Sequence, residues 1–284
     1  MKNTAILLIT CPDQKGLVAT IADFVFRHNG NILHADEHGD DTSNLFLMRV
    51  EFDPAQFDFD LAEFGKRFSP IAEKFSMTWR LAQSNYRPRM AILVSKYDHC
   101  LVDLLYRQKS GELACEIPAI ISNHPDNQAI ADFYRLPYFV VPVSSTDKRA
   151  AEQKILSLLR QHSPDFIVLA RYMQILSTQF VGEYPQRIIN IHHSFLPAFV
   201  GAKPYHQALE RGVKLIGATS HYVTAVLDDG PIIEQDVMRV SHRDSVDDLI
   251  RKGRDLERIV LARGVRLHLE SRVLPYGRKT AVFD

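Results

Sequence analysis

The sequence is poor in the features that mark secreted, zinc-binding or membrane-spanning chains. Its 284 residues include only three cysteines, Cys11, Cys100 and Cys115, and no C-x-x-C pair, so neither a disulfide framework nor a zinc ribbon is indicated. The apolar run from Ala5 to Ile9 is shorter than the core of a secretion signal, and no later run reaches membrane-spanning length. We therefore expect a cytoplasmic protein with reduced, buried thiols.

An excess of charge is also lacking. Lysine plus arginine and aspartate plus glutamate number 34 each, so the formal net charge is +0 and no basic footprint for nucleic acid is present. The twelve histidines show no H-E-x-x-H spacing and no complete ligand set, so no metal site is expected. Hydrophobic residues make up 46% of the chain, which is enough for a real core, and the length favours two domains. The balanced charge favours a small-molecule partner.

The first 83 residues are expected to form an α+β domain of ferredoxin-like type. Apolar spacing predicts a βαββαβ order, with a helix after the CPDQKG loop, a second helix over 61–75, and strands over 4–10, 32–37, 45–52 and 77–82. Residues 84–88 lose this pattern and contain a proline, as a linker does.

Residues 89–284 are expected to form a doubly wound, mostly parallel, Rossmann-like sheet, because strand-like and helical runs alternate there. The predicted strands are 89–95, 115–122, 139–142, 166–170 and 188–191, and the predicted helices are 100–108, 127–135 and 147–162. The last strand runs into the polar sequence NIHHS, at the strand end where open α/β sheets bind ligands.

The spacing of this polar cluster suits chemistry at a carbonyl. Asn190 and His192 are two residues apart in an extended segment, so their side chains are expected on one face, with Ile191 and His193 pointing elsewhere. For His193 a structural role and a contact with the substrate both stay open. An amide donor and an imidazole that meet at one oxygen can stabilise an oxyanion and deliver a proton.

Three segments resemble a known family: LARYMQILS from residue 169, NIHHSFLPAFVGAKPYHQALERG from residue 190, and GATSHYVTAVLDDGPIIEQ from residue 217. They resemble the formyltetrahydrofolate-dependent hydrolases and transferases, and the resemblance covers nearly all of residues 89–284. It implies a catalytic trio of Asn190, His192 and Asp228, the last in the turn LDDGP, and a mechanism without a metal or cofactor.

The resemblance also implies which residues contact the folate. The backbone around Gln174 and the 222–228 loop are expected to hold the pterin ring. The implied substrate-binding residues are Gln174, Ile175, Leu176, His221, Val223 and Gly230. His221 is expected either to orient Asp228 or to pair with the backbone. Three cations are either near the glutamate tail of the folate or solvated: Arg171, Lys203 and Arg243.

The acceptor of the formyl group must be inferred from another segment. In family members with a phosphorylated acceptor, a glycine- and serine-rich loop after the first strand cradles the phosphate. The corresponding segment here, SKYDHCLVDLL from Ser95, has no glycine and carries Asp98, so water is the expected acceptor. The expected reaction is hydrolysis of 10-formyltetrahydrofolate to formate and tetrahydrofolate, in support of one-carbon and purine metabolism. Formyl transfer to a non-phosphorylated amine, or an inactive amino-acid-sensing regulator, stays open as an alternative.

A second resemblance concerns the first domain. CPDQKGLVATIADFVFRHNGNI, from Cys11, resembles the ACT domain, which binds an amino acid at a subunit interface in many metabolic enzymes. It implies an effector site that includes Asp13, Gly16, Leu17 and Asn31, and a homo-oligomer. A role in oligomerisation alone stays the alternative. An ACT domain followed by a formyl-folate hydrolase domain is the arrangement found among the hydrolases of the family.

Overall fold

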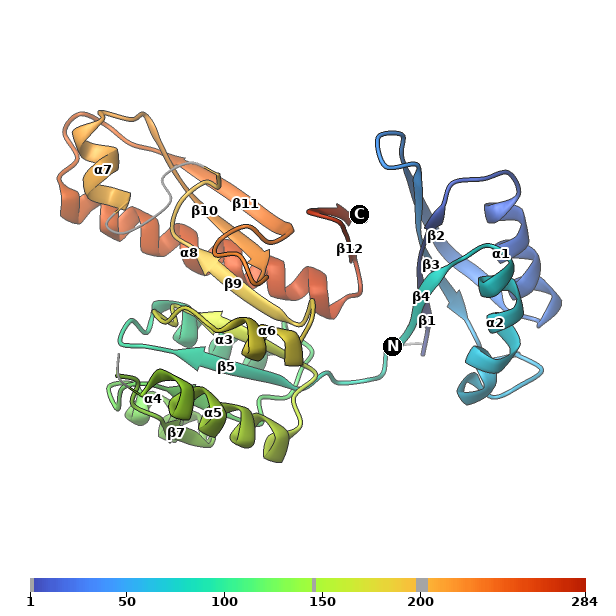
Figure 1. The fold of residues 1–284 in the computed structure, drawn as a ribbon, viewed down its shortest axis with the longest axis horizontal. Helices are drawn as coiled ribbons and strands as arrows, with labels where there is room; N and C mark the ends of the chain where they lie inside the picture. The colour runs from blue at the N-terminus through green and yellow to red at the C-terminus, as the bar shows by residue number, and fades with distance from the viewer. Residues whose placement is uncertain (1–2, 145–146, 198–203) are drawn as a thin grey trace. The chain divides into compact units, whose positions relative to one another are not determined.

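The computed structural model describes residues 3–144, 147–197 and 204–284, and the chain divides into two compact units (Figure 1). Unit 1 comprises Met1–Tyr86, Glu270–Tyr276 and Thr280–Asp284, and unit 2 comprises Arg87–Leu269 and Gly277–Lys279. The expected second domain extended from residue 89 to residue 284, whereas most of the residues after 269 group with unit 1.

Unit 1 is built on a four-stranded antiparallel sheet with the strand order β2-β3-β1-β4. Its elements are β1 (Ala5–Pro12), α1 (Leu17–Arg27), β2 (Asn31–Asp40), β3 (Leu45–Asp53), the short 3-10 helix η1 (Leu61–Glu63), α2 (Phe64–Lys74) and β4 (Thr78–Gln83). The predicted βαββαβ order is present.

The two helices of unit 1 pack on one face of this sheet. Ile21 and Phe24 lie three residues apart on α1, Phe64 and Phe68 lie four apart on α2, and both pairs pack in one core with strand residues such as Leu7. Phe24 makes edge-to-face contacts with both α2 rings.

The last strands of the chain, β12 (Val273–Tyr276) and β13 (Lys279–Val282), explain why the boundary differs from the expected one. Leu274 and Phe283 are buried in a second cluster with Leu8 and Leu47, which lie on the sheet of unit 1. The C-terminal residues therefore bury their apolar side chains against the N-terminal sheet, a long-range contact that local patterning does not reveal.

Unit 2 contains a seven-stranded sheet with the order β11-β10-β9-β8-β5-β6-β7. Its elements are β5 (Met90–Val94), α3 (His99–Ser110), β6 (Ile120–Ser122), α4 (Gln128–Tyr134), β7 (Tyr138–Val140), α5 (Lys148–His162), β8 (Phe166–Ala170), α6 (Thr178–Glu183), β9 (Ile188–His192), α7 (Pro204–Glu210), β10 (Leu215–Tyr222), β11 (Ile232–Arg239) and α8 (Val246–Leu269). The strands from β9 to β7 are parallel, and β10 and β11 extend the sheet antiparallel.

The mixed α/β class predicted for this region, with a mostly parallel sheet, is confirmed. The strand predicted over 115–122 is shorter, because only Ile120–Ser122 pairs as a named strand, and Pro118 just before it has no amide hydrogen to donate.

Helices cover both faces of the seven-stranded sheet. α5 and α6 share a core with β5, β6 and β8, while α8 packs against β9, β10, β11 and α3. β5 and β8 are buried throughout, as strands covered on both faces are. Because β5, β8 and β9 are parallel, their carboxyl ends lie at one edge of the sheet, and the polar cluster lies there.

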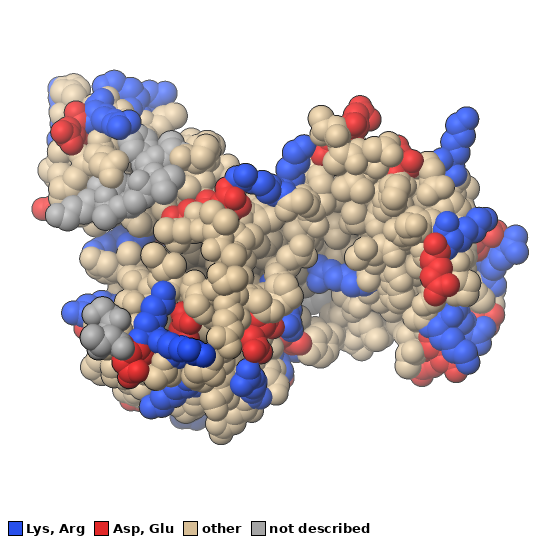
Figure 2. All heavy atoms as spheres, viewed as in Figure 1, with Lys and Arg blue, Asp and Glu red and all other residues tan. Residues whose placement is uncertain are grey.

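The surface carries both signs of charge interspersed on the visible face of each unit (Figure 2), in keeping with the formal net charge of +0. Among the described residues, no helix combines the length and the apolar composition that crossing a bilayer requires.

Candidate active site

The structure brings the three expected catalytic side chains together at the carboxyl end of β9. Asn190 and His192 lie on β9 with His192 almost fully buried, and the Nδ1 atom of His192 is 3.3 Å from the Oδ2 atom of Asp228. The Nε2 atom of His192 is buried and has no hydrogen-bond partner among the described residues. This nitrogen is therefore available to bond a substrate atom.

His221 lies opposite Asn190 on β10 and fixes the direction of its amide. The Nδ1 atom of His221 lies 3.0 Å from the backbone carbonyl of Tyr222 and must donate to it, so Nε2 carries the lone pair. The Nδ2 atom of Asn190 donates to this nitrogen at 3.2 Å. Burial lowers the pKa of His221, so its ring is neutral.

Of the two expected roles of His221, pairing with the backbone is therefore the one observed. Its Nε2 atom is 3.8 Å from the Oδ1 atom of Asp228, too far for a hydrogen bond. The contact with Asn190 was not expected from the sequence. It leaves the second N–H of the Asn190 amide for a substrate oxygen.

Asp228 reaches His192 because the LDDGP turn lies directly on the backbone of β10. Asp228 itself has φ 53°, and the amide of Tyr222 donates to the Pro231 carbonyl at 2.9 Å. A Cβ atom on Gly230 would lie 1.7 Å from the Tyr222 carbonyl oxygen, so only glycine permits this approach. Gly230, expected among the substrate-binding residues, is buried against β10 and shapes the turn.

The carboxylate of Asp228 is ionised in this setting. The hydrogen bond from His192 and the neighbouring imidazoles lower its pKa, and this outweighs the opposing effect of partial burial. The adjacent Asp229 forms an ion pair with Arg278 at the surface and takes no part in the cluster.

His193 does not point away from the site, and that expectation was wrong. Its ring centroid lies 5.2 Å from that of His192. The alternation of side chains holds only within a strand, and β9 ends at His192.

The two expected pterin-binding segments share one core cluster. Leu176 and Val223 both pack, partly buried, against the core between α5, α6 and the sheet. Gln174 is half-buried and Ile175 is exposed. The loop that carries them is held by the amide of Met173, which donates to the Ser95 hydroxyl at 3.0 Å.

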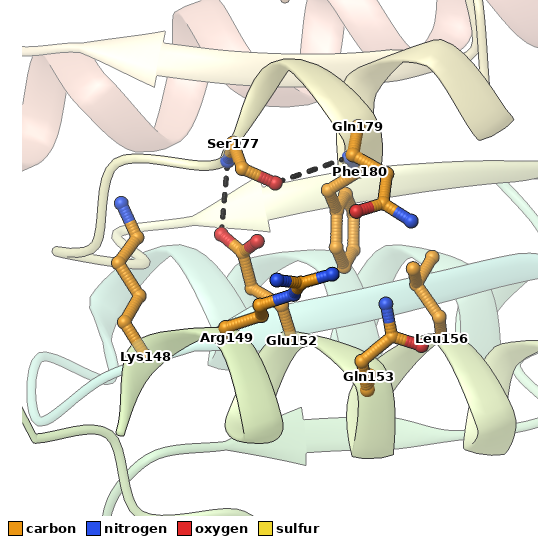
Figure 3. A pocket seen from close by; sticks show the side chains of 8 residues that line it. All are labelled: Lys148, Arg149, Glu152, Gln153, Leu156, Ser177, Gln179 and Phe180. Carbon is orange, nitrogen blue, oxygen red and sulfur yellow. Dashed lines mark hydrogen bonds between the residues drawn. The ribbon is translucent and has the colours of Figure 1, made fainter. Parts of the chain in front are cut away.

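A cavity of about 300 Å³ continues from this loop between α5 and α6 (Figure 3). Its lining comprises Lys148, Arg149, Glu152, Gln153, Leu156, Ser177, Gln179 and Phe180. Ser177 directly follows Leu176, and its amide donates to the buried carboxylate of Glu152 at 2.9 Å. Within the described parts of the chain, no acidic side chain pairs with Lys148 or Arg149, so the cavity carries net positive charge.

A buried polar network around Glu257 on α8 was missed from the sequence. Glu257 is 1% exposed and accepts from Tyr205 at 2.7 Å and from His99 at 2.8 Å. Arg171 lies 3.4 Å away, and Cys100 completes a group of possible metal ligands within 4.8 Å of one another. A cation does not fit there, because the carboxylate is already satisfied and Arg171 adds positive charge. The sequence held one sign of this network, Gly253, because a glycine inside a long helix often indicates a close packing contact.

This network also corrects the expectation for the three cations. Arg171 is buried beside Glu257 with its guanidinium over the ring of Tyr97, so it is not solvated. Arg243 is exposed, and Lys203 lies outside the described residues.

Comparisons with known proteins match this chain over its full length. The family model described as "Formyl transferase" matches residues 88–265. The formyltetrahydrofolate deformylase of Synechocystis sp. is 58% identical over 284 residues, which is 100% of both chains. The crystal structure of a formyltetrahydrofolate deformylase from Pseudomonas syringae pv. tomato is 53% identical with a TM-score of 0.98, covering 100% of this chain and 95% of that one.

A solved structure of glycinamide ribonucleotide transformylase 1 from Symbiobacterium toebii is similar over a smaller part. It is 30% identical with a TM-score of 0.67 and covers 72% of this chain and 98% of its own. The similarity to a transformylase therefore leaves part of this chain unmatched, whereas the similarity to the deformylases does not.

We predict that Gly230→Ala destabilises the protein, because the added methyl group must displace the turn from the Tyr222 carbonyl. A cost of roughly 2 kcal/mol would lower Tm by about 4–8 °C in a chain of this size. Gly182→Ala on α6 is the matched control, since its Cβ meets nothing within 4 Å, and we expect no loss of Tm there. Equal Tm values for the two variants in a thermal melt would contradict the close approach at Gly230.

Proposed function

The chain belongs to the formyl transferase family, among the formyltetrahydrofolate deformylases, and we propose that Asn190, His192 and Asp228 carry out its hydrolysis of 10-formyltetrahydrofolate to formate and tetrahydrofolate. The family and the activity expected from the sequence are confirmed. The observation that supports the trio is the meeting of an amide, an imidazole and an ionised carboxylate at the end of β9.

In the proposed mechanism, the oxygen of water forms a bond to the formyl carbon. The free N–H of Asn190 and the unpartnered Nε2 side of His192 face the oxygen that becomes negative, a contact worth on the order of 100- to 1000-fold in rate. Asp228 takes a proton from the water, and His192 passes a proton from Nε2 to the nitrogen as the carbon–nitrogen bond breaks. The proton on Asp228 then returns to His192 across their 3.3 Å contact. The second water proton leaves as formic acid ionises to formate.

Water is the acceptor that the β5–α3 connection favours. Asp98 and Tyr97 are both exposed there, and the segment from Ser95 contains no glycine that would bring backbone amides close to a phosphate. An anionic side chain and a ring at this place oppose a phosphorylated acceptor by charge and by bulk.

For the folate itself, we propose that Gln174, Ile175, Leu176, His221 and Val223 border the pterin ring, and that the cavity between α5 and α6 receives the glutamate end. The cavity adjoins the pterin-binding loop at Ser177, and its two free cations, Lys148 and Arg149, suit carboxylates. The mechanism draws on no metal or cofactor.

For unit 1, we propose an ACT-like domain that binds an amino acid and pairs with a second copy. α1 begins after Gly16, whose φ is 91°, and no side chain caps its first amides. Asp13 and Asn31 are both exposed, whereas Leu17 is buried in the core and offers its backbone only. β2 is an edge strand exposed along most of its length, which supports pairing between protomers.

Asp228→Asn is expected to lower turnover by at least ~100-fold while folate binding changes by less than about tenfold, because the amide cannot take the proton from water. Formate release under saturating substrate and binding by fluorescence quenching measure the two effects. Asp229→Asn, the neighbouring acid with a surface partner, should stay within about twofold in turnover. Undiminished turnover in Asp228→Asn would remove Asp228 from the mechanism.

Lys148→Ala is expected to raise KM about tenfold with little change in kcat, since it removes a charge-assisted hydrogen bond to the substrate that is the same in ground and transition states. Lys154→Ala, exposed on the same helix outside the cavity, is the control and should leave KM unchanged. A similar KM for both variants would place the glutamate end elsewhere.

Titration calorimetry of the full chain with single amino acids is expected to detect binding, and Asp13→Ala or Asn31→Ala should weaken it at least about tenfold. Asp41→Ala, an exposed acid in the β2–β3 turn, is the control. Absence of heat with every amino acid would leave unit 1 with oligomerisation alone.

A further inference from the structure

A histidine without an assigned role lies beside the catalytic one. His193 is half-buried, its ring is 5.2 Å from that of His192, and it has no hydrogen-bond partner among the described residues. Asn190, His192 and Asp228 each already hold a partner within the site. His193 is therefore a nearby side chain that can offer a ring nitrogen to a ligand.

The ring of His193 is supported from behind by Tyr205 on α7. The two ring centroids are 6.1 Å apart, and the phenol of Tyr205 is anchored by its hydrogen bond to Glu257. Gly253 on α8 admits this phenol, since a Cβ atom there would lie 1.9 Å from the Tyr205 oxygen. A glycine inside a helix lowers stability relative to alanine, but at this position only glycine leaves room for the Tyr205 phenol.

Glu257 is fixed in turn and stays ionised. Burial opposes its charge, but the hydrogen bond from His99, the charge of Arg171 and the hydrogen bond from Tyr205 together lower its pKa. The Glu257 carboxylate is thus bonded to α3 through His99 and to α7 through Tyr205, and it pairs with Arg171 at the end of β8.

The environment keeps His193 neutral. Burial and the charge of Arg171, assisted by His192, lower the pKa of His193 to about 4, against the opposing effects of Glu257 and Asp228. A neutral imidazole has one N–H and one lone pair, so it can accept a hydrogen bond from water. Through this bond the ring orients the water, and the proton passes to the Asp228 carboxylate as in the proposed mechanism.

We propose that His193 positions the attacking water by accepting one of its hydrogen bonds, and that Tyr205 and Glu257 are positioning residues that hold the His193 ring. This inference rests on the proposed function. One O–H of the water points at His193, the other at Asp228, and an oxygen lone pair is left to form the bond to the formyl carbon.

The variant His193→Ala is expected to lower kcat for formate release by about 10- to 100-fold, with KM within about threefold, because orientation of the nucleophile acts on the chemical step. His193→Asn should recover part of the loss, since its amide oxygen can accept the same hydrogen bond. Tyr205→Phe, which keeps the ring and loses the anchor, should show a smaller loss. His206→Ala, an exposed histidine on α7, is the control and should match the parent.

A second readout separates orientation of water from mere support of the fold. Hydroxylamine is added as a competing nucleophile, and formate and formohydroxamate are measured together. In His193→Ala the ratio should shift toward formohydroxamate, because hydroxylamine is a stronger nucleophile than water and depends less on a bond to His193. An unchanged ratio with lower kcat, a rise in KM alone, or parental kcat would each overturn the inference. If the parent itself released no formate, the proposed function would fail instead.

Discussion

The close approach of one turn to one strand is the constraint on which the site depends. Gly230 lies against the carbonyl of Tyr222 on β10. This contact holds the turn where Asp228 can reach His192 on the neighbouring strand β9. Any side chain at Gly230 would push the turn outward. Because Asp228 also has a left-handed φ, the turn keeps its shape through packing rather than through local preference.

Three histidines in one small region are made chemically different by their partners. His221 donates to a backbone carbonyl and accepts from Asn190, so it is a fixed orienting group. His192 faces an ionised carboxylate with one nitrogen and a ligand position with the other. His193 is kept neutral by burial and a nearby arginine. In the proposed mechanism the same side chain thus serves as orienter, acid and acceptor within one site.

Unit 1 contains segments from both the N-terminal and the C-terminal parts of the chain. Helix α8 contributes Glu257 to the network behind the site, and the chain then continues into β12, whose Leu274 is buried against the first unit's sheet. The residues that complete the core of unit 1 therefore come from beyond the catalytic segment. Truncation from the C-terminal side would remove core residues from the N-terminal unit.

The sequence by itself predicted the element order of unit 1, the elements of unit 2 as far as β9 except α6, and the mostly parallel sheet, because periodicity is a local property. The expectation for Asn190, His192 and Asp228 came from the resemblance of short motifs to a family. The sequence did not reveal that His193 turns toward His192, that His221 orients Asn190, or that Glu257 joins Tyr205, His99 and Arg171, because these contacts join residues up to 158 positions apart. From the sequence, residues 270–284 were expected to belong to the second domain, whereas most of them pack with unit 1. Nothing local distinguishes which sheet will bury an apolar strand. Tertiary packing decided these points, because the partners of a buried polar or apolar group are chosen by the fold as a whole.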